Sequence, residues 1–153
     1  IAWWSNYLEA KMSRNTSIGK DLEKNISIIL NELKIPHKGG VNSKHVFAGL
    51  KKNMHKCYVD LITNANEEKN ENKTLISAKH QNVKGTAEEK ILHETMVLSQ
   101  LIKDYGYKKA VIILDGDGWT WKNYYLSEEY KEIIKVFPKV DIIDFNQIKD
   151  YNF

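Results

Sequence analysis

An acid and a lysine, Asp60 and Lys79, stand on two apolar segments that flank one polar loop. The segments, residues 56–63 and 74–81, have the composition of β-strands, whereas the loop at 64–73 is rich in charged and amide side chains. If the segments pair as a hairpin, opposed residue numbers sum to about 137–139, which places Asp60 across from Lys79 or the residues just before it. An acid facing a lysine is the minimal equipment for metal-assisted cleavage of a phosphodiester bond.

Each of these two side chains has a definite part in such chemistry. A carboxylate binds Mg²⁺, whose octahedron is completed largely by water. A lysine ammonium group can orient or deprotonate the attacking water and stabilise the charge that develops on the phosphate. Alternation along 74–81 places Lys79 on the same face as Ser77 and Gln81, and opposite to Ile76 and Ala78.

Hydrophobic periodicity predicts the elements that must position these residues. Residues 17–33 and 87–105 keep apolar side chains at helical spacing, and Thr86 and Glu89 have the spacing of a capping box at the start of the second helix. Gly106 is expected to end that helix. The remaining predictions are a helix at 1–12, strands near 44–50, 56–63, 74–81, 109–114 and 140–145, and a helix at 127–136.

The order of these elements predicts an α/β fold with a mixed central sheet flanked by helices, because antiparallel strands come first and a crossover helix follows. The continuous apolar run at 110–114 is typical of a strand covered on both faces. Within 56–63, alternation predicts that Val59 and Leu61 share one face, with Asp60 on the other.

At these residues the chain resembles the restriction-endonuclease-like nucleases, the family named for its PD-(D/E)xK motif. The resemblance covers roughly residues 18–145. It rests on the αβββαβ order, followed here by a further helix and strand, and on Asp60, Lys79 and Gln81. It also includes Glu23, since many members carry a glutamate in the first helix that helps to bind metal.

The phrases at 77–81 and 85–91 are similar to type II restriction enzymes in particular. The chain departs from the family pattern at two positions. Val59 rather than proline precedes Asp60, which is a variable position in the family. Ser77 stands where the second acid is expected, which removes one metal ligand. Some members compensate with another glutamate, and the candidates in this chain are Glu23, Glu88, Glu89 and Glu94.

The resemblance implies a Mg²⁺-dependent DNA endonuclease, with a restriction endonuclease as the favoured type and Mn²⁺ able to substitute. Asp60, Glu23 and the backbone carbonyl of Ala78 would hold the metal, with Glu89 as a weaker candidate. Lys79 would position the attacking water and neutralise the phosphate, and Gln81 would help to orient the water or the substrate.

Double-stranded DNA is the expected partner. Three basic residues, Lys84, Lys51 and Lys52, are candidates for phosphate contacts, although a solvated surface explains them equally well. His80 is expected to point away from Lys79, and His37, His45, His55 and His93 show no metal-binding spacing. The family resemblance leaves a homodimer and further domains of the same chain open.

Composition sets the outer limits of the interpretation. The chain has 153 residues, a net charge of +3 and one cysteine, which excludes internal disulfides and thiolate zinc sites. No apolar run approaches the roughly 20 residues that a membrane helix needs, and we expect a cytoplasmic protein. We expect one catalytic domain over residues 1–153, and, because the chain opens on Ile1, a fragment of a longer protein.

Two other functions remain open at this stage. One is a structure-selective repair or recombination nuclease on the same fold, which would cleave at branches or ends of DNA. The other is a catalytically inactive DNA-binding domain, in which Ser77 marks a site that has lost its second acid.

Overall fold

A computed structural model describes residues 18–40 and 45–153 of the chain. The helix expected at 1–12 lies outside the described residues. Within the described part, no helix combines the length and the apolar character that crossing a membrane requires.

The first described helix, α2 (Ile18–Glu32), confirms the periodicity of residues 17–33. Its side chains Leu22, Ile26, Ile29 and Leu30 are all buried, and they lie three or four positions apart on one face. This face packs against the central sheet, where α2 contacts β5 (Thr74–His80).

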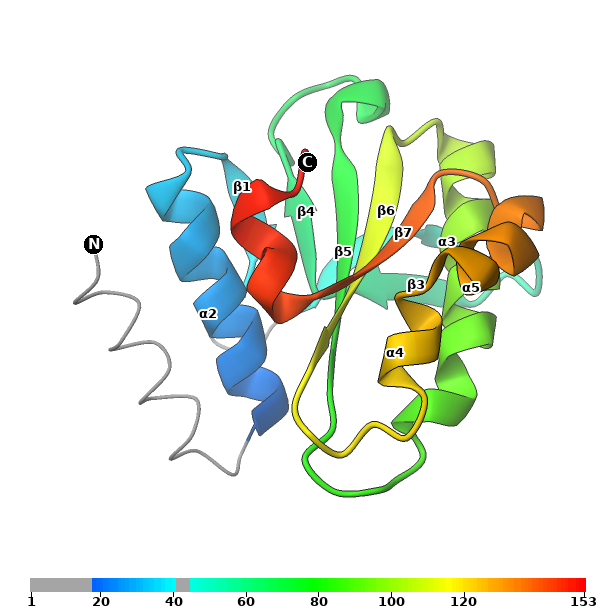
Figure 1. The fold of residues 1–153 in the computed structure, drawn as a ribbon. Helices are drawn as coiled ribbons and strands as arrows, with labels where there is room; N and C mark the ends of the chain where they lie inside the picture. Colours follow the sequence, from blue (N-terminus) through cyan, green and yellow to red (C-terminus); the bar gives the residue numbers. More distant parts are fainter. Residues whose placement is uncertain (1–17, 41–44) are drawn as a thin grey trace.

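Five strands form the central sheet, in the order β1-β4-β5-β6-β7 (Figure 1). Pairing is antiparallel from β1 to β5 and parallel from β5 to β7, so the mixed α/β sheet expected from the sequence is confirmed. The bounds of the strands not yet given are β1 (His37–Gly39), β4 (Leu61–Thr63), β6 (Lys109–Asp115) and β7 (Val140–Asp144).

The hairpin register also agrees with the sequence. Leu61 pairs with Ile76 and Ile62 pairs with Leu75, so that Asp60 comes next to Ser77. The backbone N–H of Asp60 donates a hydrogen bond to the Ile76 carbonyl at 3.1 Å. The acid therefore reaches the strand that carries the lysine.

The single strand expected at 56–63 is wrong: the chain forms two strands there, β3 (Lys56–Val59) and β4, separated at Asp60. β3 pairs with β2 (Val46–Leu50) in a separate two-stranded sheet. The predicted shared face of Val59 and Leu61 fails as well, because these residues lie in different core clusters. The physical reason is that the chain leaves one sheet and enters another at Asp60, which resets the alternation of its side chains.

The second long helix, α3 (Ile91–Tyr105), follows a 3₁₀ turn, η2 (Ala87–Lys90). The predicted capping box is wrong, because the Thr86 side chain makes no capping hydrogen bond. The Gln81 side-chain carbonyl takes over the capping role and accepts from the Ala87 N–H at 3.1 Å. Gly106 ends the helix in the left-handed conformation, at φ 75°, as expected.

The C-terminal part largely follows the prediction. Ser127 caps α5 (Glu128–Ile133), which continues as a 3₁₀ turn, η3 (Ile134–Val136). The other short elements are η1 (Asn70–Asn72), α4 (Lys122–Tyr125) and η4 (Phe145–Asp150).

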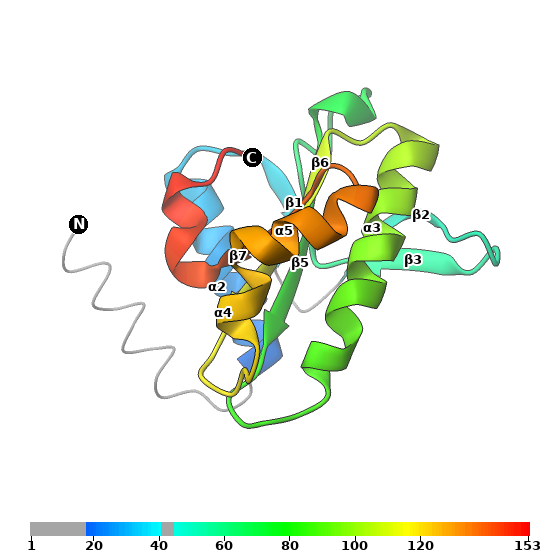
Figure 2. The ribbon, with the colours of Figure 1, turned by 45° about the vertical axis from the view of Figure 1, so that its right-hand side comes forward.

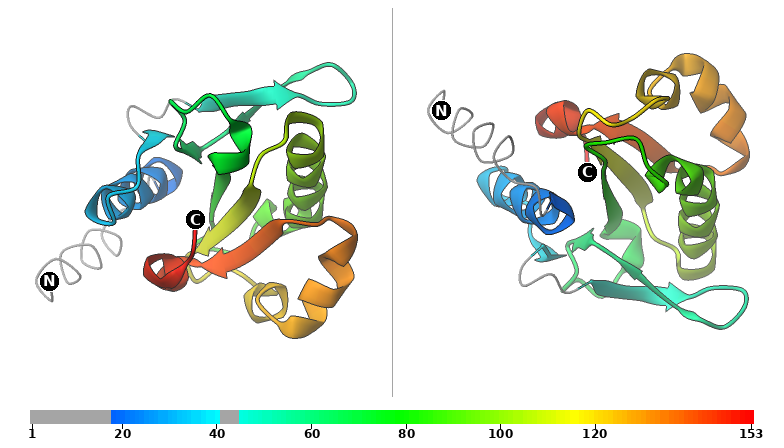
Figure 3. Two further views of the ribbon diagram at one scale, coloured as in Figure 1. Left: turned by 90° about the horizontal axis from the view of Figure 1, so that it is seen from above. Right: turned by 90° about the horizontal axis from the view of Figure 1, so that it is seen from below.

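Helical layers cover both faces of the sheet (Figures 1 and 2). One buried cluster, which includes Ile112, lies beneath α3 and α5, and the other, which includes Ile113, lies beneath α2 and η4. β6 contributes alternate residues to the two clusters, and its residues 110–114 are fully buried, which confirms the expected two-sided strand. The hairpin of β2 and β3 extends past the main sheet next to α3 (Figures 2 and 3).

We expect Gly39→Ala to lower the free energy of unfolding by at least about 3 kcal/mol. Gly39 has φ 103°, and a Cβ there would overlap the backbone carbonyl of Asp60. The matched control is Gly106→Ala, where φ is 75° and no atom lies within 4 Å of the added Cβ. Backbone strain alone should cost the control about 1–2 kcal/mol. Urea unfolding measures both values, and equal losses would contradict the close approach of β1 to Asp60.

Candidate metal centre and lysine site

Asp60 is held at the junction between the two sheets. It is a buried residue, and its carboxylate oxygen Oδ2 accepts a hydrogen bond from the Ala78 backbone N–H at 2.6 Å. The other oxygen, Oδ1, lies 3.3 Å from Nε2 of His45. The carboxylate is thus fixed against β5 with one oxygen directed away from that strand.

Glu23 of α2 joins this carboxylate. Its side chain is 11% exposed, and its oxygen Oε1 lies 3.6 Å from Nε2 of His45. Glu23, His45 and Asp60 each offer one ligand atom, and these atoms all lie within 4.8 Å of one another. Two carboxylates and an imidazole are ligands that divalent metal ions accept.

The turn at Gly40 allows α2 to approach the sheet this closely. A Cβ at Gly40 would lie 2.9 Å from the backbone carbonyl of Glu23 and 2.8 Å from Cβ of Ser27. Gly40 has φ 78°, a conformation that favours glycine. The turn at Gly40 therefore helps to bring Glu23 close to Asp60.

The pKa of Glu23 is raised from 4.5 to about 8, first by burial and then by the negative charge and hydrogen bonding of Asp60, while the charge of Lys79 opposes the shift. The other Glu23 oxygen, Oε2, is buried without a hydrogen-bond partner. Two close carboxylates and an unpartnered buried oxygen are what a bound cation would stabilise. The residues present therefore fit a divalent metal ion.

A second acid approaches the lysine from α3. Oε1 of Glu94 accepts a hydrogen bond from the Ser77 hydroxyl at 2.8 Å, and Oε2 of Glu94 lies 3.8 Å from Nζ of Lys79. Ser77 occupies the position where the motif expects an acid, and Glu94 delivers a carboxylate directly to it. Among the glutamates weighed from the sequence, Glu23 and Glu94 are the two that the structure brings to the site.

The other acids and Gln81 contact other groups or solvent. Glu88 accepts a hydrogen bond from the Trp121 backbone N–H at 2.7 Å, and Glu89 is exposed. Both ends of the Gln81 amide are engaged by backbone groups, since it donates to the Gly118 carbonyl at 2.8 Å and caps Ala87. Gln81 thus holds together the two loops that follow β5 and β6.

The basic residues proposed for DNA contact lie in two different loops. Lys51 and Lys52 are in the turn of the β2–β3 hairpin, where Lys52 pairs with Asp104 at 3.1 Å. Lys84 is exposed in the loop after β5.

His45 is the site residue that sequence reasoning missed. Its two acidic neighbours come from other elements, α2 and the β3–β4 junction, so no local spacing marks it. By contrast, His80 contacts Asp115 at 2.8 Å, on the strand next to β5. No spacing rule could have found His45, because Glu23 and Asp60 both lie far from it in the sequence.

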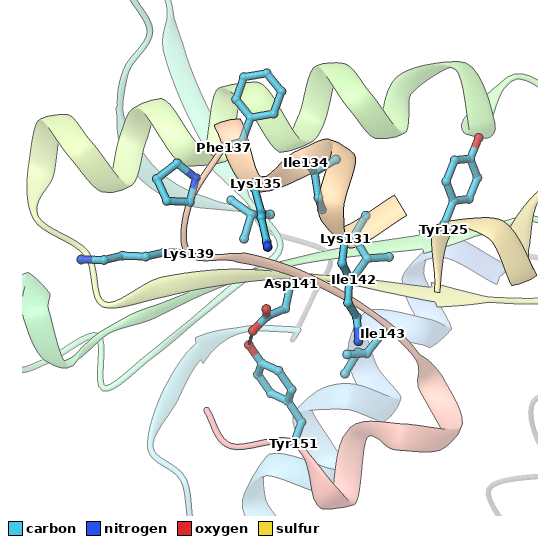
Figure 4. Close-up of a pocket in the computed structure, with 12 residues that line it drawn as sticks. Tyr125, Lys131, Ile134, Lys135, Phe137, Lys139, Asp141, Ile142, Ile143 and Tyr151 are labelled. Carbon is cyan, nitrogen blue, oxygen red and sulfur yellow. Dashed lines mark hydrogen bonds between the residues drawn. The ribbon is translucent and has the colours of Figure 1, made fainter. Parts of the chain in front are cut away.

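A cavity of about 550 Å³ lies along β7, between η3 and Tyr151 (Figure 4). Its carboxylate, Asp141, accepts a hydrogen bond from the Tyr151 hydroxyl at 2.6 Å, which the close-up shows as a dashed line. None of its lining residues belongs to the acidic cluster around Asp60, so we give this cavity no part in the chemistry.

A mixed sheet between helical layers, with an acid beside one strand and a lysine on the next, is the arrangement of the PD-(D/E)xK nucleases. The chain belongs to this superfamily: residues 14–138 match the model of the PD-(D/E)XK nuclease superfamily domain.

One solved structure is similar to the chain, a crystal structure of a protein of unknown function, AF1548, with a TM-score of 0.48 and 16% sequence identity. The match covers 81% of this chain and 56% of that one, so the chain spans little more than half of its length. No curated protein matches the chain significantly.

We expect Glu23→Gln to stabilise the metal-free protein increasingly as the pH rises from about 5 to about 9. In the parent protein, folded Glu23 keeps its proton up to about pH 8, whereas the unfolded chain loses it near 4.5. The free energy of unfolding of the parent therefore falls across this window, by up to roughly 1 kcal/mol per pH unit. Glutamine does not titrate, so the free energy of unfolding of the variant lacks this pH-dependent loss. Thermal unfolding at a series of pH values checks this, and a constant difference between the two proteins would contradict it.

Proposed function

We propose that this protein is a metal-dependent nuclease that hydrolyses phosphodiester bonds in DNA. The main observation behind the proposal is that Glu23, His45 and Asp60 converge beside β5, the strand that carries Lys79. The chain also belongs to a nuclease superfamily. We further propose that residues 1–153 act as one catalytic domain.

Glu23, His45 and Asp60 would hold the metal ion, with the Ala78 backbone carbonyl as a further ligand. A divalent ion there would polarise a phosphoryl oxygen and acidify a bound water. We propose Mg²⁺ or Mn²⁺ as the ion. The imidazole of His45 is a softer ligand than the oxygens that Mg²⁺ prefers, and it supports binding of Mn²⁺.

Lys79 would place its ammonium group against the scissile phosphate, where it orients the attacking water and stabilises the developing negative charge. Its contact with Glu94 at 3.8 Å supports this role, because a carboxylate at that distance restricts the direction of the lysine side chain. Glu94 would thus act as a positioning residue that replaces the acid missing at Ser77.

One candidate within this class is a restriction endonuclease acting on double-stranded DNA, because the segments at 77–81 and 85–91 resemble those enzymes. A second candidate is a nuclease selective for branched or single-stranded DNA structures. An exposed aromatic pair next to the site, Phe47 and Tyr58, favours this second candidate.

We expect Lys79→Ala to retain DNA binding and to lose at least roughly 100-fold of the cleavage rate, because it removes a preorganised charge at the phosphate. Cleavage of labelled duplex and forked DNA in Mg²⁺ or Mn²⁺ measures the rate, and fluorescence anisotropy measures binding. Lys103→Ala, an exposed lysine on α3, is the matched control and should cleave normally. Equal rates for the parent and Lys79→Ala would refute the assigned role.

We expect Glu94→Gln to reduce cleavage by roughly 10-fold to 100-fold, since a positioning carboxylate next to a catalytic group typically contributes that much. Glutamine keeps the shape of the side chain and an oxygen that can accept from Ser77, so folding should be preserved. Glu89→Gln, which changes an exposed acid five residues earlier in the sequence, should have no effect. If the two variants lose activity equally, Glu94 does not compensate for Ser77.

We expect EDTA to abolish cleavage, and Mg²⁺ or Mn²⁺ to raise the melting temperature of the parent at about pH 8. Asp60→Asn should lose most of this metal-dependent stabilisation, because it removes a carboxylate from the cluster. Differential scanning calorimetry measures the shift. A metal-independent melting temperature, together with absent cleavage, would instead identify an inactive domain.

A further inference from the structure

The β2–β3 hairpin has one face that is packed and one that is not. Ala48, Cys57 and Val59 are buried on the inner face, and the Tyr107 hydroxyl donates to the Ala48 carbonyl at 2.8 Å. This inner face contacts α3, so the hairpin is held against the body of the protein (Figure 3). The outer face has no such cover among the residues that the structure describes.

Phe47 and Tyr58 stand on the outer face as a cross-strand pair. Each is 51% exposed, and their ring centroids lie 5.8 Å apart in an edge-to-face arrangement with an interplanar angle of 66°. In this geometry the two rings contact each other favourably, and the remaining ring surface is accessible to a third aromatic group. Two large aromatic side chains are thus presented to solvent on a rigid two-stranded support.

The pair is next to the metal centre along both strands. Tyr58 is two residues before Asp60, and Phe47 is two residues after His45. His45 and Phe47 are both exposed and flank the buried Val46, so alternation along the chain places Phe47 on the side on which His45 lies. At about 3.3 Å per residue, the separation along the strand is about 7 Å, or roughly two base steps of DNA.

The charge of the hairpin suits a polyanion. Residues 45–59 contain three lysines and two histidines but no acidic residue. Lys56 is exposed and, by alternation along β3, shares the face of Tyr58. Lysine is depleted in the cores of protein–protein interfaces, so the combination of lysines and open aromatic rings favours a nucleic acid over a protein partner.

We propose that Phe47 and Tyr58 form a stacking platform for unpaired bases next to the scissile phosphate, so that the substrate class is DNA with a single-stranded segment, such as a fork, flap or overhang. An aromatic ring can stack only on a base whose face is free, and the bases of an intact duplex cover one another. Residues 45–59 also contain no arginine, the residue that most often reads base edges in a duplex groove. The cleavage part of this inference rests on the proposed nuclease function, whereas the binding part does not.

The test compares the binding of three labelled DNAs, a single strand, a fork and a blunt duplex of the same sequence, in EDTA so that no cleavage occurs. Fluorescence anisotropy should show that Phe47→Leu/Tyr58→Leu binds the single strand and the fork at least about tenfold more weakly than the parent does. Binding to the blunt duplex should change less than about twofold. The parent should prefer the fork over the blunt duplex.

Two controls separate stacking from a structural effect. Tyr58→Phe keeps an aromatic ring and should bind like the parent, whereas Tyr58→Leu alone should lose affinity for the single strand and the fork. Trp121→Leu removes a 57% exposed aromatic side chain outside the hairpin and should leave binding unchanged. Thermal unfolding of the double variant checks that the hairpin still packs on α3.

The outcomes distinguish this inference from the proposed function. Cleavage that depends on Asp60 and Lys79, combined with unchanged binding by the double variant, would overturn the platform and leave the nuclease intact. Aromatic-dependent binding of single strands without any metal-dependent cleavage would support the platform and overturn the nuclease. Equal loss of affinity for all three DNAs would also overturn the platform, because a stacking surface must discriminate unpaired from paired bases.

Discussion

A single hydrogen bond, from the Ala78 N–H to the carboxylate of Asp60 at 2.6 Å, joins the parts of the molecule on which the site depends. On one side of it is β5, paired in parallel with β6, and on the other is the junction where the chain passes from β3 to β4. A hydrogen bond to a charged acceptor is shorter and stronger than a neutral one. It fixes the carboxylate relative to Lys79, one residue further along β5, and leaves the other oxygen directed towards Glu23 and His45.

The site brings acidic side chains together without enough positive charge beside them to neutralise both. Glu23 and Asp60 are buried acids in close proximity, and burial and the neighbouring charge hold the pKa of Glu23 well above its ordinary range. Lys79 opposes that shift and also contacts Glu94, so one lysine interacts with an acid on α2 and an acid on α3, two helices on opposite faces of the sheet.

Much of the fold and part of the candidate site could be predicted from the sequence, for identifiable physical reasons. The register of β4 and β5 was predictable because a polar loop separates two apolar runs, and β6 was predictable from its unbroken apolar residues. The division at Asp60 was not, because residues 56–63 read as one strand whether or not the chain changes sheets. His45 could not be predicted as a site residue for a related reason, because its acidic neighbours reach it only through tertiary contacts. Glu94 was one of several similar acids, and only the packing of α3 distinguished it from Glu89.

The short antiparallel part of the sheet gives the site a property of its own. β1 and β4 have three residues each, whereas β5 and β6 have seven each and are paired along their whole length. Local opening of a protein begins where backbone hydrogen bonds are few, so the β1–β4 edge can detach while the parallel strands stay folded. A cation shared by Glu23 and Asp60 would connect this edge to α2. Binding of the ion would then stabilise the β1–β4 edge against local opening.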